Sequence, residues 1–387
     1  MRFNPPVYLT AARRSPIGRF GGGLKSLAPA ELALQVAEAI VPAELKPTVE
    51  QVILGQVLSA GAGMNLARQL GLRLGVPQLS PAFTVNMACA SGLHAVSLAA
   101  SAVASGEAAL VLAGGVEVMS RAPHYAPDLR WGKKLGDTTL VDALFVDGLS
   151  DPVVKLGMGE TAERIADVFN IPREAQDEFA ARSQQRAAEH REALHREIVA
   201  VTSADGVVSQ DEHPRAGTTT ATLAQLSPAF RANGTVTPGN SSGLNDGAAL
   251  VLLANGAALK QHALQARARI VACTVVGCDP AMMGLGPIGA VQKLCEETGW
   301  SLSDVDAVEI NEAFAVQTLA CARALKIDPA RINQRGGAIA LGHPIGASGA
   351  RVLVTLLHIL EDRKLRRGIA SLCVGGGMGI AMAIERK

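Results

Sequence analysis

Cys89 is the first residue of this sequence whose type and position suggest chemistry. It stands in FTVNMACASG, a pattern typical of a strand, a short turn and the start of a helix. The N-terminus of a helix offers free backbone N–H groups and a partial positive charge, both of which favour an anion. We therefore expect a stabilised thiolate and a nucleophile here. The alternative is a small buried side chain, since most free cysteines are buried.

Further candidates for proton transfer and oxyanion binding lie in three other turns. Cys373 ends a strand pattern before a glycine run that starts at Gly375, where a ligand could reach backbone N–H groups. Asn311 follows another strand pattern, and its amide could hold a water, donate to an oxyanion or cap the next helix. His343 lies between glycine and proline, where an imidazole could act as a base or only support a turn.

An imperfect internal duplication relates two of these turns. Short segments recur in the same order along the chain: 49–52 with 305–308, 89–92 with 346–349, and 110–115 with 372–377. His343 then lies in the turn that corresponds to the turn of Cys89. A pseudo-twofold relation between two homologous halves can bring these turns together, which suits a Cys/His pair.

The elements that must position these residues alternate between strands and helices, which favours an α/β architecture. We expect strands over 52–58, 81–85, 108–113, 305–310, 337–341 and 370–374, and helices over 91–105 and 348–360. Between the halves the chain is charged and rich in loops, with a strongly helical stretch over 160–198. The predicted division is 1–119 for the first part of an N-terminal domain, 120–237 for an inserted loop domain, 238–265 for the return to the N-terminal domain, and 266–387 for a C-terminal domain.

Composition excludes several classes of function. The net charge of the 387 residues is +1 and aromatic residues make up 3%, which argues against nucleic acid as a partner. The six cysteines show neither a C-x-x-C pair nor zinc spacing, so we expect reduced thiols in a cytosol and no metal site. The N-terminus has no secretory signal pattern. The uncharged run over 74–106 contains prolines and several serines, so we expect a buried segment there and no membrane span.

One literal motif match is misleading. GLGPIG at 284–289 fits the dinucleotide fingerprint G-x-G-x-x-G. However, six residues separate it from the preceding strand pattern, and Pro287 lies inside it. The tight strand-to-helix turn is therefore missing, so we expect a loop before a helix. A nucleotide-dependent oxidoreductase has no other support in the sequence.

Taken together, the motifs resemble those of the thiolase family over nearly the whole chain. They are ARRSPIGRFGG at 12–22, N-x-x-C-x-S-G around Cys89, TPGNSSGLNDG at 237–247, NEAFA at 311–315, GHP at 342–344 and C-x-G-G-G from Cys373. The resemblance implies a thiolase-like fold: two duplicated α/β domains in a five-layered αβαβα arrangement, with a loop domain inserted in the first.

The resemblance also implies roles for the candidate residues. Cys89 would be the nucleophile that takes an acyl group as a thioester, His343 would take the thiol proton, and Cys373 would be the second acid/base. Asn311, through a water, and His343 would form one oxyanion hole. The backbone N–H groups of Cys89 and Gly375 would form the other.

Coenzyme A and acyl-CoA are the implied substrates, with no permanently bound cofactor. The implied contacts are Arg215 near the nucleotide phosphate, Phe230 and Ser242 along the pantetheine, and Met158 and Phe314 around the acyl group. Short-chain biosynthetic members tend to have His-Met-Gly where this chain has Gly157-Met158-Gly159. The preferred acyl length therefore stays open.

The expected activity is acyl transfer between 3-ketoacyl-CoA and CoA in a cytoplasmic homodimer or homotetramer. A β-ketoacyl synthase is an alternative on the same fold, but that class pairs its cysteine with two histidines, whereas this chain has Cys373 before the glycine run. A non-catalytic acyl-CoA-binding relative is the alternative from another class.

Overall fold

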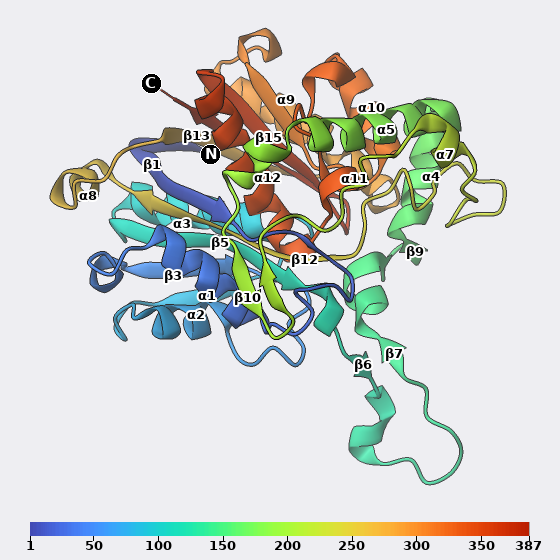
Figure 1. Cartoon of the computed structure of the whole chain (residues 1–387), viewed down its shortest axis with the longest axis horizontal. Helices are drawn as coiled ribbons and strands as arrows, with labels where there is room; N and C mark the ends of the chain where they lie inside the picture. Colours follow the sequence, from blue (N-terminus) through green and yellow to red (C-terminus); the bar gives the residue numbers. More distant parts are fainter. Residues whose placement is uncertain (387) are drawn as a thin grey trace.

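The computed structural model describes residues 1–386 as two similar halves joined through their sheets (Figure 1). Strands of the first half pair in the order β1-β12-β5-β3-β4, and those of the second in the order β14-β15-β16-β13. Antiparallel pairing of β1 with β13 joins them. The strands are β1 (Arg2–Arg14), β3 (Gln51–Gly55), β4 (Ala82–Val85), β5 (Leu110–Val118), β12 (Asn245–Ala254), β13 (Ala268–Gly277), β14 (Ala307–Ile310), β15 (Arg367–Val374) and β16 (Met378–Glu385), with β2 (Gly18–Arg19) beside β12.

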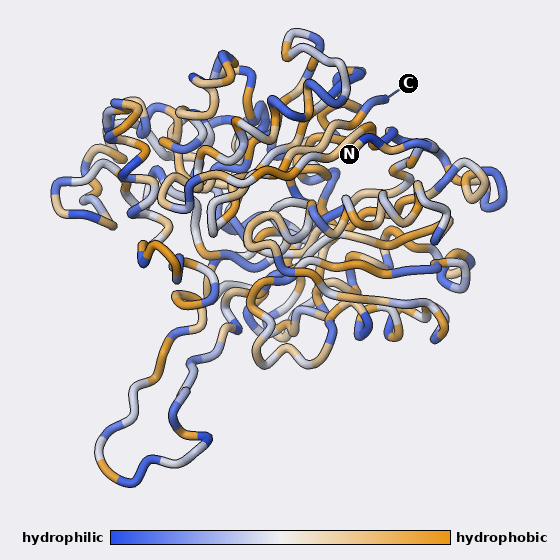
Figure 2. The backbone as a smooth tube through the Cα atoms, turned by 180° about the vertical axis from the view of Figure 1, so that it is seen from behind, coloured by the Kyte–Doolittle hydropathy of each residue, from blue (hydrophilic) through white to orange (hydrophobic). Residues whose placement is uncertain are grey.

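Helices and sheets form five layers, which confirms the predicted fold class. Helices α3 (Ser91–Ser105) and α12 (Ile345–Asp362) lie between the two halves of the sheet, and one core joins all three layers (Figure 1). Helices α1 (Pro29–Ile40) and α2 (Leu66–Leu74) cover the outer face of the first half. Helices α9 (Gly286–Thr298) and α10 (Ala315–Leu325) cover the second. In Figure 2 the hydrophobic residues follow the central strands accordingly.

The segment 88–105 is long and apolar enough to cross a membrane by composition alone. In the structure it includes α3, whose side chains pack into the central core between the two halves. Burial inside the fold therefore explains its composition, as expected from the sequence.

The two central helices cross with their backbones in contact. A Cβ added at Gly92 of α3 would lie 2.9 Å from the carbonyl oxygen of Gly346, and one at Gly349 of α12 would lie 2.5 Å from the amide nitrogen of Leu93. Hydrogen is the only side chain that fits these positions. The turns that precede the two helices, which carry Cys89 and His343, are thereby held next to each other.

Three of the predicted strands are wrong in detail. The strand expected over 52–58 ends at Gly55. Strand β5 does not stop at its glycines but runs on to Val118. Gly115 is needed for a close backbone contact and not for a turn, since a Cβ there would lie 2.1 Å from the carbonyl oxygen of Gly346. The expected strand over 337–341 is the short helix α11 (Ala338–Leu341). The corresponding strand of this half is reduced to one bridge between Val308 and Ile332.

The insertion between the halves contains helices and small hairpins. Its helices are α4 (Met158–Phe169), α5 (Arg173–Glu189), α6 (Arg191–His195) and α7 (Thr220–Ala224), and α8 (Gly256–Gln261) follows β12. Its short strands are β6 (His124–Tyr125), β7 (Val141–Asp142), β8 (Ser150–Asp151), β9 (Leu156–Gly157), β10 (Val201–Ser203) and β11 (Gly206–Val208). Figure 1 shows the segment around β6 and β7 reaching away from the rest of the molecule. The domain boundaries themselves stay a prediction.

Candidate active site

A strained turn presents Cys89. Strand β4 ends at Val85 and α3 begins at Ser91, as the sequence predicts. Between them Ala88 has a φ of +43°, a conformation that residues other than glycine seldom adopt. The Ser91 hydroxyl fixes the turn, because it accepts the Met87 N–H at 2.9 Å and donates to the Ala88 carbonyl at 2.7 Å. Cys89 is left half-buried at the start of the helix.

The expectation of a resting thiolate is wrong. Burial raises the pKa of Cys89 to about 11, although the backbone N–H groups of Gly375 and of Cys89 itself point toward the sulfur and oppose this shift. Desolvation disfavours the charged form more than two N–H groups favour it. The thiol is therefore protonated near neutral pH, and a base must take its proton when it attacks.

His343 has the properties of that base. Its side chain is buried, and burial together with the positive charge of Arg351 lowers its pKa to about 3, so the imidazole is neutral. Its Nδ1 lies 2.6 Å from Oγ of Ser348, whose own proton is donated to the Pro344 carbonyl at 2.8 Å. The hydroxyl oxygen must therefore accept from Nδ1–H. This leaves an unprotonated Nε2 that can accept a proton.

Asn311 and Cys373 lie beside these groups. Asn311 is fully buried, and its Nδ2 is 3.5 Å from Nε2 of His343. Cys373 is 1% exposed at the end of β15, and burial and the neighbouring Cys89 raise the pKa of its thiol well above the ordinary value. Gly375, two residues on, directs its N–H at Cys89. The structure thus brings Cys89 together with Cys373 and Gly375 of the second half and places Asn311 against His343, while the crossing of the central helices holds the turns of Cys89 and His343 next to each other.

Four of the five predicted coenzyme A contacts also lie together. The ring of Phe230 meets that of Phe314 edge-on at 6.0 Å. A Cβ added at Gly375 would lie 3.5 Å from the sulfur of Met158. The Ser242 N–H donates to the carbonyl of Ala313, next to Phe314, at 3.0 Å. Arg215 stands outside these contacts, since it lies on an exposed loop that packs on α5.

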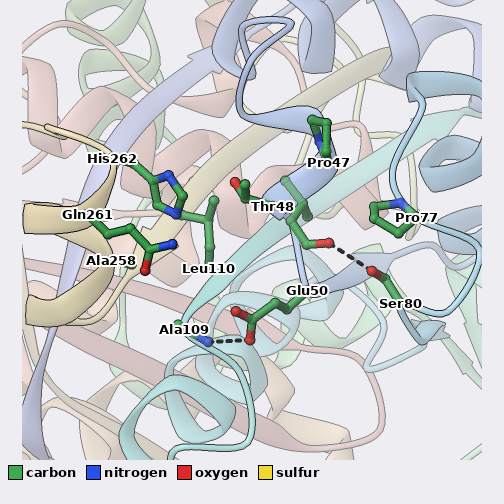
Figure 3. A pocket seen from close by; sticks show the side chains of 11 residues that line it. Pro47, Thr48, Glu50, Pro77, Ser80, Ala109, Leu110, Ala258, Gln261 and His262 are labelled. Atoms are coloured by element: carbon green, nitrogen blue, oxygen red, sulfur yellow. Dashed lines mark hydrogen bonds between the residues drawn. The ribbon is translucent and has the colours of Figure 1, made fainter.

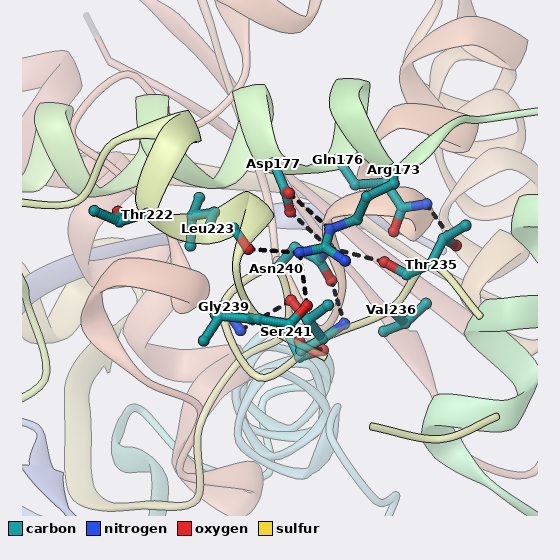
Figure 4. A network of polar contacts seen from close by, with 12 residues as sticks. Arg173, Gln176, Asp177, Thr222, Leu223, Thr235, Val236, Gly239, Asn240 and Ser241 are labelled. Carbon is teal, nitrogen blue, oxygen red and sulfur yellow. Dashed lines mark hydrogen bonds and ion pairs between the residues drawn. The ribbon is translucent and has the colours of Figure 1, made fainter. Parts of the chain in front are cut away.

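A polar network holds the loop that carries Ser242 (Figure 4). Asp177 of α5 accepts from the Asn240 side chain at 2.9 Å and pairs with Arg173 at 2.6 Å. The Asn240 side chain in turn accepts the Thr237 N–H at 2.8 Å. Because α5 holds Asn240 and Asn240 holds Thr237, the insertion fixes the position of the loop that carries Ser242.

Sequence reasoning missed three supporting residues. Ser348 could have been found, since the duplication makes it the counterpart of Ser91. Asn245 accepts the His343 N–H at 2.9 Å and lies inside a quoted motif. Glu117 accepts the N–H groups of Val57, Leu58 and Gly346 at 2.9, 3.2 and 3.0 Å, so it ties the first half to the start of α12. Its signal is a lone charge in an apolar strand pattern.

We expect the buried carboxyl group of Glu117 to make the free energy of unfolding depend on pH. Burial raises its pKa from 4.5 to about 7 against the opposing N–H bonds. The folded chain then keeps the proton to a higher pH than the unfolded chain. The contribution of Glu117 to the free energy of unfolding therefore falls by about 3 kcal/mol as the pH rises from about 4.5 to about 7. Between pH 5 and pH 8, the free energy of unfolding measured with urea should fall more in the wild type than in Glu117→Gln, by most of this amount. Equal losses in the two proteins would contradict the assignment.

Two other features do not belong to this site. The 284–289 glycine motif spans the end of a 3₁₀ helix (Pro280–Leu285) and the first turn of α9, so it forms no dinucleotide turn. Figure 3 shows a pocket of about 380 Å³ at the edge of the first half, lined by none of the predicted site residues. Its Ser80 and Glu50 are occupied by hydrogen bonds to Val49 and Ala109 of the chain itself.

Comparison with known proteins agrees with this geometry. Residues 7–257 match the thiolase N-terminal domain and residues 264–386 match the thiolase C-terminal domain. The chain is 46% identical to acetyl-CoA acetyltransferase of Allochromatium vinosum, covering 99% of this chain and 100% of that protein. It is 45% identical to the cytosolic acetyl-CoA acetyltransferase of Mus musculus, over 98% of each. The solved structure of human mitochondrial 3-ketoacyl-CoA thiolase in complex with CoA superposes with a TM-score of 0.97 at 41% identity, covering 100% of this chain and 99% of that one. The chain belongs to the thiolase family.

Proposed function

We propose that this protein is an acetyl-CoA C-acyltransferase that moves an acyl group between 3-ketoacyl-CoA and CoA through a covalent intermediate on Cys89. The observation that carries the proposal is the backbone N–H of Gly375, supplied by the second half, directed at the thiol of the first. An oxyanion formed on a carbon attached to this sulfur would lie next to two N–H donors, those of Gly375 and Cys89. Family membership and the names of the relatives support the same activity.

In the cleavage direction, the Cys89 sulfur attacks the 3-keto carbon while Nε2 of His343 takes the thiol proton. The bond between the second and third carbons then breaks, and its electron pair leaves with acetyl-CoA as an enolate. Cys373 protonates this enolate, and Asn311, through a water, and His343 stabilise its oxygen. The thiol of free CoA finally attacks the thioester on Cys89 and gives up its proton to Cys373. Cys89 leaves as a thiolate and recovers its proton from His343, and the shortened acyl-CoA is released. Condensation of acetyl-CoA is the reverse sequence.

The substrate would enter along the insertion. We assign Met158 and Phe314 to the acyl group and Phe230 and Ser242 to the pantetheine, because these residues surround the Gly375 side of the site. The exposed Arg215 is assigned to the nucleotide phosphates, since an arginine binds phosphate oxygens through several N–H groups. CoA is a substrate here and not a resident cofactor.

A cytoplasmic oligomer, dimeric or tetrameric, completes the proposal. The segment around β6 and β7 reaches away from the rest of the molecule (Figure 1). Within it Trp131 is 88% exposed and Leu135 is 91% exposed. Large apolar side chains exposed to this degree are typical of a contact surface. The cytosolic name of the mouse relative supports the compartment.

The activity is tested with CoA and 3-ketoacyl-CoA substrates of increasing chain length. We expect loss of the enolate absorbance of acetoacetyl-CoA together with release of acetyl-CoA, and the rates along the series give the preferred length. The β-ketoacyl synthase alternative predicts activity only with substrates carried on acyl carrier protein. Binding without turnover of any 3-ketoacyl-CoA would favour the non-catalytic alternative and overturn the proposal.

A further inference from the structure

One face of α12 contacts both members of the proposed first oxyanion hole. Ser348 and Arg351 lie three residues apart, so their side chains project from the same face of the helix. Ser348 holds Nδ1 of His343, as described above. Arg351 is 2% exposed, and its Nη2 donates to Oδ1 of Asn311 at 3.4 Å.

This contact decides which way the Asn311 amide points. A carboxamide has an acceptor oxygen and a donor nitrogen, whereas a guanidinium has only donors. The atom that faces Arg351 must therefore be Oδ1, and Nδ2 must face His343, where it lies 3.5 Å from Nε2. The reversed amide would set two donors against each other at Arg351 and would present an oxygen to the reacting centre. In that orientation the amide could not donate a hydrogen bond to the water that stabilises the developing oxyanion.

Arg351 makes few other bonds that could explain its burial. Within residues 1–386 its Nε and Nη1 have no hydrogen-bond partner. Burial and the neighbouring Arg14 lower the pKa of its guanidinium, whereas the buried Glu309, Glu197 and Glu312 nearby oppose this shift. Glu312 is itself fixed by Asn333 and Ser183, at 2.9 and 2.7 Å. Within the described residues, the hydrogen bonding of this buried guanidinium is therefore directed at Asn311.

We propose that Arg351 is a positioning residue for the thiolase reaction. It holds Oδ1 of Asn311, so that Nδ2 faces the water that donates to the enolate oxygen, and it adds a buried positive charge behind that donor. The inference rests on the proposed function of Asn311 and His343. A charge in this low-dielectric interior polarises the amide more strongly than it would in water. Enolate formation and enolate protonation are the steps that depend on it.

Arg351→Lys tests the inference because it keeps the charge but shortens the reach to Asn311. We expect kcat for acetoacetyl-CoA cleavage to fall by about 10- to 100-fold, since small displacements of a site group have effects of this size. The KM for CoA should change by less than about twofold, since the hydrogen bond of Arg351 goes to Asn311 and not to a group assigned to CoA binding. The matched control is Arg335→Lys, another buried arginine, which pairs with Asp362 at 2.6 Å and should keep its kcat.

A double-mutant cycle separates positioning from a merely structural role. If Arg351 acts through Asn311, Arg351→Lys should have almost no further effect on kcat in the Asn311→Ala background. Equal effects in both backgrounds would overturn the inference. If Arg351→Lys does not fold, Arg351→Gln combined with Glu309→Gln, which replaces a buried carboxyl group near the guanidinium, serves in the same cycle.

The cycle also separates this inference from the proposed function. If neither Asn311→Ala nor His343→Ala lowers the activity, the proposed roles of those residues fail. If both lower it and Arg351→Lys has wild-type kcat, only the role of Arg351 fails.

Discussion

Cys89→Ala is expected to lower the rate of acetoacetyl-CoA cleavage by at least about 10,000-fold, the scale of losing a covalent nucleophile. The reason is that the N–H groups of Gly375 and Cys89 point at this thiol, and that the turn of Cys89 is held next to the turn of the neutral His343. Initial rates measure the loss. Intact-protein mass spectrometry after incubation with acetoacetyl-CoA alone should show an added acetyl group on the wild type and none on the variant.

The control for this substitution is Cys295→Ala. Cys295 is also a half-buried free cysteine, but it lies in α9 on the outer face of the second half. It should keep wild-type rates and still gain the acetyl mass. Acylation of Cys89→Ala at another residue would refute the assignment of the nucleophile.

The second large effect is expected for Cys373→Ser, which should lower turnover by about 100- to 10,000-fold, the range for loss of a general acid/base. A serine hydroxyl keeps the shape of the side chain but is a far weaker acid than a thiol, so it gives up its proton less readily. Turnover with CoA and acetoacetyl-CoA measures this loss. Because His343 serves the attack of Cys89, the variant should still be acylated by a simple acyl donor such as acetyl-CoA.

His343→Ala provides the contrast. It should lose acylation as well as turnover, since the thiol of Cys89 is protonated near neutral pH and needs the base. The division of labour fails if Cys373→Ser cannot be acylated, or if His343→Ala is acylated at the wild-type rate.

The sequence predicted the fold and the site to different depths. The duplication was sufficient to relate the turns of Cys89 and His343, and the structure places these turns at the crossing of α3 and α12. The strand expected over 337–341 was wrong because a short run of small apolar residues suits a buried helix as well as a buried strand. Strand β5 was cut short because glycine usually ends a strand, whereas here it admits a neighbouring backbone.

The electrostatics of the site could not be predicted from the sequence. The N-terminus of a helix favours a thiolate, and that rule led to the expectation for Cys89. The outcome depends on desolvation by residues that lie far from Cys89 in the chain, which no local pattern reveals. The same holds for Arg351 and Glu117, whose partners Asn311 and Gly346 lie far from them in the chain.

The crossing of α3 and α12 also limits which substitutions the two copies of the duplicated unit can accept. Their outer helices pack on separate cores and can vary independently. At Gly92 and Gly349, however, each copy leaves room only for the backbone of the other. A methyl group on either side would move the nucleophile and the base apart at once. A substitution at Gly92 or Gly349 in one copy would therefore disturb the other copy as well, and the sequences of the two copies constrain each other where their helices cross.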